Sequence, residues 1–374
     1  MHIADFNVAK VDKRVRATAT VTWEDCDQPA REIFIETEEQ FEHDITCNPH
    51  AFLVGCIIPA LRFGEQRIVL DADICPTLRD GLQTVMAVMK EWSRGEYRPL
   101  RIEGRTQSVS SDVHAKRRAG LFLSGGIDSL AALRANKLNY PEEHPGSIKD
   151  CFLVHGFDIG GVAARGMKYH VFDRARAALE AVARDAQVTL IPVYTNIRHL
   201  CDERDLWLDK FFGAVLAAVG HAFVLRLHLA YIASSYDIPN LVPCGSHPLL
   251  DPEYSSFDLR FKLLGLALSR LEKLRLVADW DAAFQNFRVC LANVADRLNC
   301  GKCEKCVRTM TELIAIGALD KTRAFNENDV TPELFSHFKI TIRHRAPFYE
   351  EMLPLLKQRE RDDLVRTITK MLQD

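Results

Sequence analysis

Short alternating patterns of apolar and polar residues dominate the first third of the chain. Residues 15–23 and 31–37 alternate with a period of two, which is typical of half-buried strands. Residues 82–92 instead repeat their apolar positions every three to four residues, as an amphipathic helix does. These patterns predict an α+β amino-terminal module over residues 1–115, and the polar stretch 104–112 is the expected linker at its end.

The pattern changes after residue 116 to short apolar runs that alternate with longer amphipathic ones. The expected buried strands are residues 119–123, 150–155, 188–193 and 240–243, and the expected helices are residues 130–138, 171–186, 263–276 and 307–316. Strand–helix alternation of this kind predicts an α/β fold with a doubly wound parallel sheet over residues 116–285. Residues 286–374 are expected to form a helical carboxyl-terminal part.

Composition narrows the classes of protein to consider. Hydrophobic residues make up 47% and charged residues 26% of the 374 residues, which are ordinary values for a globular chain of about two domains. The formal net charge of −3 gives no electrostatic reason to expect a nucleic-acid partner. No apolar run reaches the roughly 18 residues that span a bilayer, and the first residues lack the pattern of a signal peptide. We therefore expect a cytoplasmic protein that needs no membrane.

A glycine-rich turn separates the first expected strand of the parallel sheet from its helix. Its glycines allow successive backbone N–H groups to face one anion, and the helix start adds partial positive charge. Asp128 would repel a bound polyphosphate unless a cation lay between them, so it indicates Mg²⁺. The alternative is an ordinary turn followed by helix-capping residues. The predicted phosphate-binding residues are Ser124, Gly125, Gly126, Ile127, Asp128 and Ser129.

Four of the eleven cysteines cluster near the expected last helix, at Cys290, Cys300, Cys303 and Cys306. Two residues between cysteines, with Gly301 allowing a tight turn, favour a knuckle that places two sulfurs on one tetrahedral ion. Four thiolates leave no open position, so a structural Zn²⁺ site is the leading interpretation. An iron–sulfur cluster is the competing one, and clustering without a metal is the third. The other seven cysteines are expected to be small core residues of a reducing compartment.

The turn resembles the S-G-G-x-D-S signature of the PP-loop, or N-type, ATP pyrophosphatases. That resemblance implies a sheet of the adenine nucleotide α-hydrolase type, bound ATP and Mg²⁺, and transfer of AMP to a carbonyl oxygen with release of pyrophosphate. Together with the motif C-x9-C-G-K-C-E-K-C, it is similar to the 7-cyano-7-deazaguanine synthases over residues 117–315. Those enzymes adenylate a carboxylate, add ammonia to give an amide, and convert the amide to a nitrile.

The resemblance also implies roles for residues outside the loop. Asp128 and Ser129 would be catalytic. Lys273 is a candidate second clamp on the phosphates, and its alternative is a solvated lysine on an amphipathic helix. His155 and Asp158 follow the second expected strand, where a family member would meet adenosine.

The segment 244–256 stands where that family carries its substrate signature, and the family's purine-reading pattern is missing from it. We therefore expect a different acceptor, either a small molecule or a peptide. Ser246, His247 and Asp251 are the candidates to face that acceptor or a metal. His247 precedes a proline, so a turn residue is the equal alternative for it.

Three functions follow from these motifs. The first is an AMP-forming ligase that adds ammonia or an amine to an adenylated carboxylate or amide. The second is a sulfur-inserting enzyme that thiolates RNA or a small molecule, and the third is a non-catalytic nucleotide-binding component of a complex. His2 stands where glutaminase-bearing relatives have their nucleophilic cysteine, so ammonia or an amine would come free or from a partner protein. A homodimer stays open.

Overall fold

A computed structural model describes the protein over residues 1–106, 117–159, 166, 168–290, 292–338 and 342–373. Its centre is one ten-stranded sheet in the order β10-β9-β6-β7-β8-β3-β2-β1-β4-β5. The α/β class predicted from the sequence is confirmed, and the sheet is mostly parallel. No helix in these residues is long and apolar enough to cross a membrane.

In the parallel half of the sheet, the order in which strands are added switches from one side of β6 to the other. Its strands are β6 (Arg118–Phe122), β7 (Ile148–His155), β8 (Thr189–Thr195), β9 (Leu227–Ala233) and β10 (Arg260–Leu264), and all of them pair in parallel. The chain runs from β6 outward through β7 and β8, and it then returns to add β9 and β10 on the other side of β6. In open α/β sheets such a switch point lies where ligands bind, at the carboxyl ends of the strands. The fold therefore places the end of β6 at the expected binding edge.

The amino-terminal strands extend the same sheet. They are β1 (His2–Val11), β2 (Arg14–Thr22), β3 (Arg31–Glu38), β4 (Arg67–Ile74) and β5 (Arg101–Thr106). Strand β3 pairs antiparallel with β8, with Ile35 opposite Thr195 and Thr37 opposite Val193. Residues 1–106 and the parallel half thus share one sheet across the expected boundary. Of the expected linker, residues 104–106 lie in β5 and residues 107–112 lie outside the described part of the chain.

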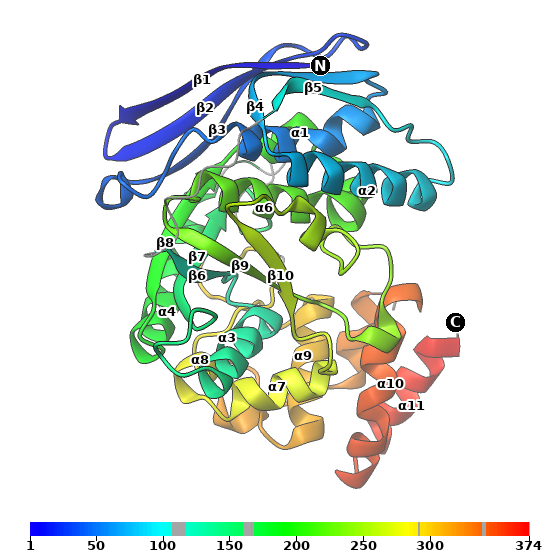
Figure 1. Cartoon of the computed structure of the whole chain (residues 1–374). Helices are drawn as coiled ribbons and strands as arrows, with labels where there is room; N and C mark the ends of the chain where they lie inside the picture. Colours follow the sequence, from blue (N-terminus) through cyan, green and yellow to red (C-terminus); the bar gives the residue numbers. More distant parts are fainter. Residues whose placement is uncertain (107–116, 160–165, 167, 291, 339–341, 374) are drawn as a thin grey trace.

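Helices cover both faces of the parallel half of this sheet, and α1 and α2 lie under one face of the amino-terminal strands (Figure 1). The α-helices are α1 (Pro49–Arg62), α2 (Pro76–Trp92), α3 (Ile127–Asn139), α4 (Tyr169–Asp185), α5 (Arg204–Leu206), α6 (Phe212–Ala222), α7 (Arg270–Ala278), α8 (Asp281–Phe284), α9 (Glu304–Ile316), α10 (Ile342–Gln358) and α11 (Asp362–Gln373). Phe122 and Phe152 point into a core with α1, α2 and α6, whereas Leu121 and Leu153 point into a second core with α3, α4, α7 and α9. This alternation is the period of two expected for a strand that is buried on both faces.

Shorter helical turns connect these elements. They are η1 (Glu39–Phe41), η3 (Ile197–Leu200), η4 (Trp207–Phe211), η5 (Ile238–Asn240), η6 (Asp251–Tyr254), η7 (Leu319–Lys321) and η8 (Pro332–His337). The turn η4 is a π-helix that runs directly into α6.

Two predicted elements are wrong. Residues 240–243 form no strand, because η5 ends there and Pro243 cannot donate to a ladder. The predicted helix 263–276 begins only at Arg270, and residues 260–264 form β10 instead. A capping box fixes the true start, since the Ser269 side chain accepts from the Glu272 N–H and the Glu272 side chain accepts from the Ser269 N–H.

Candidate functional site

The glycine turn lies at the carboxyl end of β6 and runs directly into α3. Gly125 has φ of +76°, a backbone conformation that L side chains rarely adopt. Gly126 is the extended N-cap of α3, and no side chain of the described residues caps that helix start. The first N–H groups of α3 therefore stay available to an external acceptor.

The side chains of the two serines in the turn face each other. The Ser124 and Ser129 hydroxyl oxygens are 3.3 Å apart, and Ser129 donates to the Gly126 carbonyl at 3.0 Å. Ser124 accepts from the Gly126 N–H at 3.3 Å. Ile127 is buried in the second core, so it contributes only its backbone to the turn. Of the six residues predicted for the loop, Ile127 is thus anchored in the core, Ser129 is buried and Ser124 is exposed.

Asp128 in the first turn of α3 faces two cations from α7. Its Oδ1 is 3.4 Å from Arg270 Nη1 and 3.7 Å from Lys273 Nζ. Lys273 also donates to the Ser234 carbonyl at 2.7 Å and is only 1% exposed, so the solvated lysine envisaged as the alternative is wrong. Burial lowers the pKa of Lys273, and the Asp128 carboxylate opposes that shift.

A buried network of charges on α9 holds Arg270 from the other side. Both Glu312 oxygens accept from Arg270 Nε, at 3.2 and 3.4 Å, and Arg308 lies 3.7 Å from the same carboxylate. Arg270 Nη2 also donates to the Thr309 hydroxyl at 3.4 Å. Burial raises the pKa of Glu312, while Arg270 and Arg308 oppose the rise. The Glu312 carboxylate has no exposed surface and is paired with Arg270 on one side and Arg308 on the other.

The four clustered cysteines converge as the motif predicts. Their sulfur atoms all lie within 4.8 Å of one another, with Cys300 and Cys306 at 3.8 Å and Cys303 and Cys290 at 3.9 Å. A Zn–S bond of about 2.3 Å places tetrahedral sulfurs about 3.8 Å apart, and a disulfide would bring them to about 2 Å. In an iron–sulfur cluster the four thiolates are divided between two irons or bind four different irons, so they cannot all lie on one ion. The spacing therefore suits one shared metal ion such as zinc.

Backbone donors orient these sulfurs. Cys300 accepts from the Lys302 and Cys303 N–H groups at 3.4 and 3.2 Å, and Gly301 between them has φ of +72°. The S–H groups of Cys303 and Cys306 face Cys290 and lower its pKa far below the ordinary value. Cys303 is the N-cap of α9, so the helix dipole also favours thiolates there.

Two residues that the motifs did not single out support this cluster. Asn299 is 1% exposed, and its carbonyl oxygen accepts from the Val289 N–H at 2.8 Å and the Cys290 N–H at 3.3 Å. The N–H of Arg288 donates to the Gly125 carbonyl at 2.8 Å, so the segment leading to Cys290 is bonded directly to the glycine turn. The cysteine cluster and the turn are therefore parts of one connected structure.

His155 ends β7 and lies among aromatic rings. It stacks on Tyr169 at 4.6 Å between centroids and contacts Tyr194 at 5.7 Å. Arg14 of the amino-terminal β2 lies over the Tyr194 ring at 3.6 Å. Asp158 is 3.3 Å from Arg198, and its carbonyl accepts from Asn293 at 2.8 Å. His155 is the last residue of β7 and Asp158 lies just beyond it, at the strand end where the predicted adenosine site would be.

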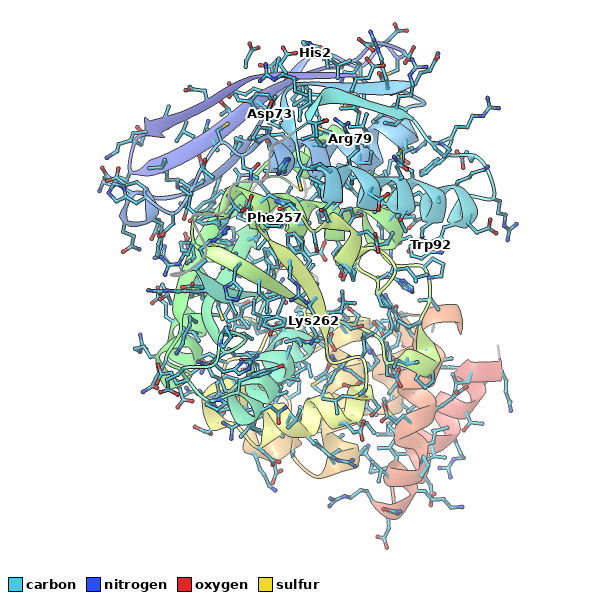
Figure 2. All side chains as sticks on the ribbon, in the orientation of Figure 1. His2, Asp73, Arg79, Trp92, Phe257 and Lys262 are labelled. Carbon is cyan, nitrogen blue, oxygen red and sulfur yellow. The ribbon has the colours of Figure 1, made fainter. Side chains whose placement is uncertain are left out.

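The three residues predicted to face the acceptor form hydrogen bonds within their own loop. Asp251 is fully buried, and its oxygens accept from the Ser246 hydroxyl at 2.5 Å and the His247 N–H at 3.3 Å. Burial raises the pKa of Asp251 to about 7. The His247 ring accepts from the Leu249 N–H and meets Trp92, which Figure 2 shows at the end of α2, edge-on at 5.1 Å. These contacts shape the loop, and they favour the turn interpretation of His247.

Tyr236 lies between β9 and this loop. Burial raises the pKa of Tyr236 to about 12, and Cys244 and Asp128 act in the same direction from either side. Its ring stacks on Phe348 of α10 at 5.8 Å.

A cavity of about 190 Å³ lies beside Arg270. Its lining residues are Asp237, Asn240, Ser269, Arg270, Pro347, Phe348 and Glu351. A larger hollow of about 540 Å³ lies elsewhere, lined by Arg118 at the start of β6 and Lys149 at the start of β7. That hollow is at the amino ends of the strands, whereas the glycine turn lies at the opposite, carboxyl edge of the sheet.

Arg270, Glu312, Arg288 and Asn299 are residues of the candidate site that sequence reasoning missed. Arg270 precedes Lys273 by three residues, which puts the two on one helix face, and this spacing was the available signal. Glu312 gave none, because its partner lies 42 positions away in the chain.

Comparison with protein-family models, with curated proteins and with solved structures gives no match to this chain.

Proposed function

We propose that this protein cleaves ATP between its α and β phosphates and transfers AMP to a carboxylate or amide oxygen of an acceptor, to which ammonia or an amine is then added. The observation that supports this most is the position of the turn. Gly125 and Gly126 follow β6 at the switch point of the parallel sheet, and they lead into a helix whose first turn carries Asp128 beside the buried Lys273.

Each group of the turn has a proposed part in holding the triphosphate. The N–H groups at the start of α3 bind the departing pyrophosphate. The Ser124 and Ser129 hydroxyls donate to it as well, for which Ser129 gives up its bond to the Gly126 carbonyl. Lys273 adds a positive charge that needs no reorganisation, because the Ser234 carbonyl already fixes it. Asp128 is 26% exposed and is the carboxylate proposed to bind Mg²⁺, which supplies charge neutralisation between the phosphates when bound.

The same geometry provides positive charge beside Asp128 without a metal ion. A cation must lie between Asp128 and a polyphosphate, and the chain itself supplies two candidates in Lys273 and Arg270. Asp128 would hold Mg²⁺ in place of these partners, and the metal would supply charge neutralisation there.

The proposed reaction needs no protein nucleophile. A carboxylate resists attack by an amine because oxide would have to leave. Once its oxygen attacks the α phosphorus and displaces pyrophosphate, AMP becomes the leaving group for the incoming amine. The protein's part is to position the reactants and to stabilise charge.

The proposed occupant of the four-cysteine centre is Zn²⁺, and its proposed role is structural. Its four thiolates complete a tetrahedral set and leave no position for water or acceptor. This single-ion spacing also favours the ligase over the sulfur-inserting alternative, which needs a redox-active cysteine or cluster. The proposed location is the cytoplasm, where free thiols persist.

The test is incubation of the purified protein with Mg·ATP and a library of carboxylates, amides and short peptides, with AMP and pyrophosphate as the products measured. We expect acceptor-stimulated AMP release from the wild type and none from Asp128→Asn, which should stay folded because Asp128 is partly exposed. Unchanged AMP formation by that variant would reject the scheme. Nucleotide binding without turnover, for any library member, would support the non-catalytic alternative.

A further inference from the structure

The position of Arg270 resembles that of a ligand-binding group more than that of a surface ion-pair partner. Its side chain is 7% exposed, and each nitrogen of the guanidinium has a different assignment. Nε faces Glu312, Nη2 faces Thr309, and Nη1 faces Asp128 of the turn. The planar guanidinium is therefore fixed in orientation, with one edge toward the turn.

We infer that Arg270 is a phosphate-binding residue of this turn and that Glu312 of α9 is the positioning residue that holds it there. The inference rests on the proposed function and deepens it. Arginine binds phosphate oxygens through parallel N–H donors, and a guanidinium fixed before the ligand arrives loses little side-chain freedom on binding. Arg270 and Lys273, three residues apart on α7, then form a pair of cations opposite the N–H groups of α3.

The surroundings of Glu312 explain why a carboxylate is kept in the core at that point. Glu312 has no exposed surface, so an unpaired charge there would be strongly unfavourable. Arg308 shares the carboxylate from the next turn of α9 but is also paired with Glu304 at 3.0 Å. Glu312 is the carboxylate that contacts Arg270 Nε, and through that contact it sets the direction of Nη1.

A matched set of variants separates this role from general loss of charge. Arg270→Met removes the guanidinium and keeps the apolar stem, and Arg275→Met removes an equal charge from the exposed face of the same helix. Since Arg270→Met leaves Glu312 short of a partner, the double variant Arg270→Met/Glu312→Gln removes both charges and protects the fold.

The experiment is isothermal titration calorimetry with Mg·ATP and with inorganic pyrophosphate, with thermal unfolding as the check on folding. We expect Arg270→Met and the double variant to bind both ligands about tenfold or more weakly, as for the loss of a bond between charged groups, and Arg275→Met to bind within about twofold of the wild type. Glu312→Gln alone should weaken binding, and combining it with Arg270→Met should add nothing further, because both act through one guanidinium.

The outcomes distinguish this inference from the proposed function. If the wild type binds both ligands and Arg270→Met or the double variant binds them equally well, the role of Arg270 is rejected while the proposed function stands. If the losses from Glu312→Gln and Arg270→Met are additive, Glu312 does not act through Arg270. If the wild type binds neither Mg·ATP nor pyrophosphate, the proposed function and this inference fail together.

Discussion

Two buried histidines join α1 of the amino-terminal part to α6 of the parallel half, and they should make the protein sensitive to mild acid. The rings of His50 and His221 lie 5.7 Å apart. His50 Nε2 accepts from the Cys75 N–H at 3.0 Å, which requires a neutral ring. His221 Nε2 lies 2.8 Å from the Tyr254 carbonyl and donates to it. Protonation of His50 would therefore break a bond in the shared core.

The structure sets the direction and size of the effect. Burial lowers the pKa of His50 from 6.5 to about 4. Between these values the unfolded chain binds more protons than the folded one, so this contribution to stability is complete above pH 6.5 and is lost as the pH falls toward 4. At about 1.4 kcal/mol per pKa unit, the full loss is about 3 kcal/mol, and most of it is reached by pH 4.5.

Urea unfolding of the wild type and of His50→Gln, at pH 7.5 and at pH 4.5, measures this contribution. Glutamine offers an amide oxygen to the Cys75 N–H and does not titrate. The free energy of unfolding of the wild type should fall between the two pH values by about 2–3 kcal/mol more than that of the variant. Asp251, whose pKa is raised to about 7, acts in the opposite direction, but it is present in both proteins and cancels. Equal pH dependence in the two proteins would refute the burial of His50 between the two halves.

Two further changes test the metal centre and the glycine turn. Cys303→Ser removes one of four converging thiolates, so it should lose bound zinc and lower the free energy of unfolding by about 4 kcal/mol or more; full metal content by mass spectrometry would reject the ligand set. Gly125→Ala should lower stability by about 1–2 kcal/mol, because φ is +76° there, and should also weaken pyrophosphate binding. Gly64→Ala is the control, since Gly64 has the same φ and nothing within 4 Å of an added Cβ, and it should lose stability alone.

The sequence predicted the strand, turn and helix around residues 118–139 because each signal there is local. An apolar run, two glycines and an amphipathic segment follow one another, and none depends on a distant partner. The cysteine centre was predictable for the same reason, since three of its ligands lie within seven residues. Strand β9 was not predicted. The segment 240–243, which follows it and contains Pro243, was wrongly predicted as a strand instead.

Other features depend on contacts between distant parts of the chain. Lys273 is buried because the Ser234 carbonyl and Asp128 meet it, and no local pattern distinguishes that from a solvated lysine. The pairing of β3 with β8 joins residues about 160 positions apart, so the composition change after residue 115 suggested two modules where one sheet exists. The start of α7, by contrast, could have been predicted, because the capping box of Ser269 and Glu272 is a local signal.

The most direct test of the account is a crystal structure of the zinc-loaded protein with Mg²⁺ and α,β-methylene-ATP, an analogue that cannot be cleaved between its α and β phosphates. The account predicts its β and γ phosphates against the N–H groups that follow Gly125, with Lys273 within hydrogen-bond distance and Asp128 facing the metal. An analogue seated elsewhere, with the turn left open to solvent and Asp128 still paired with Arg270, would contradict it.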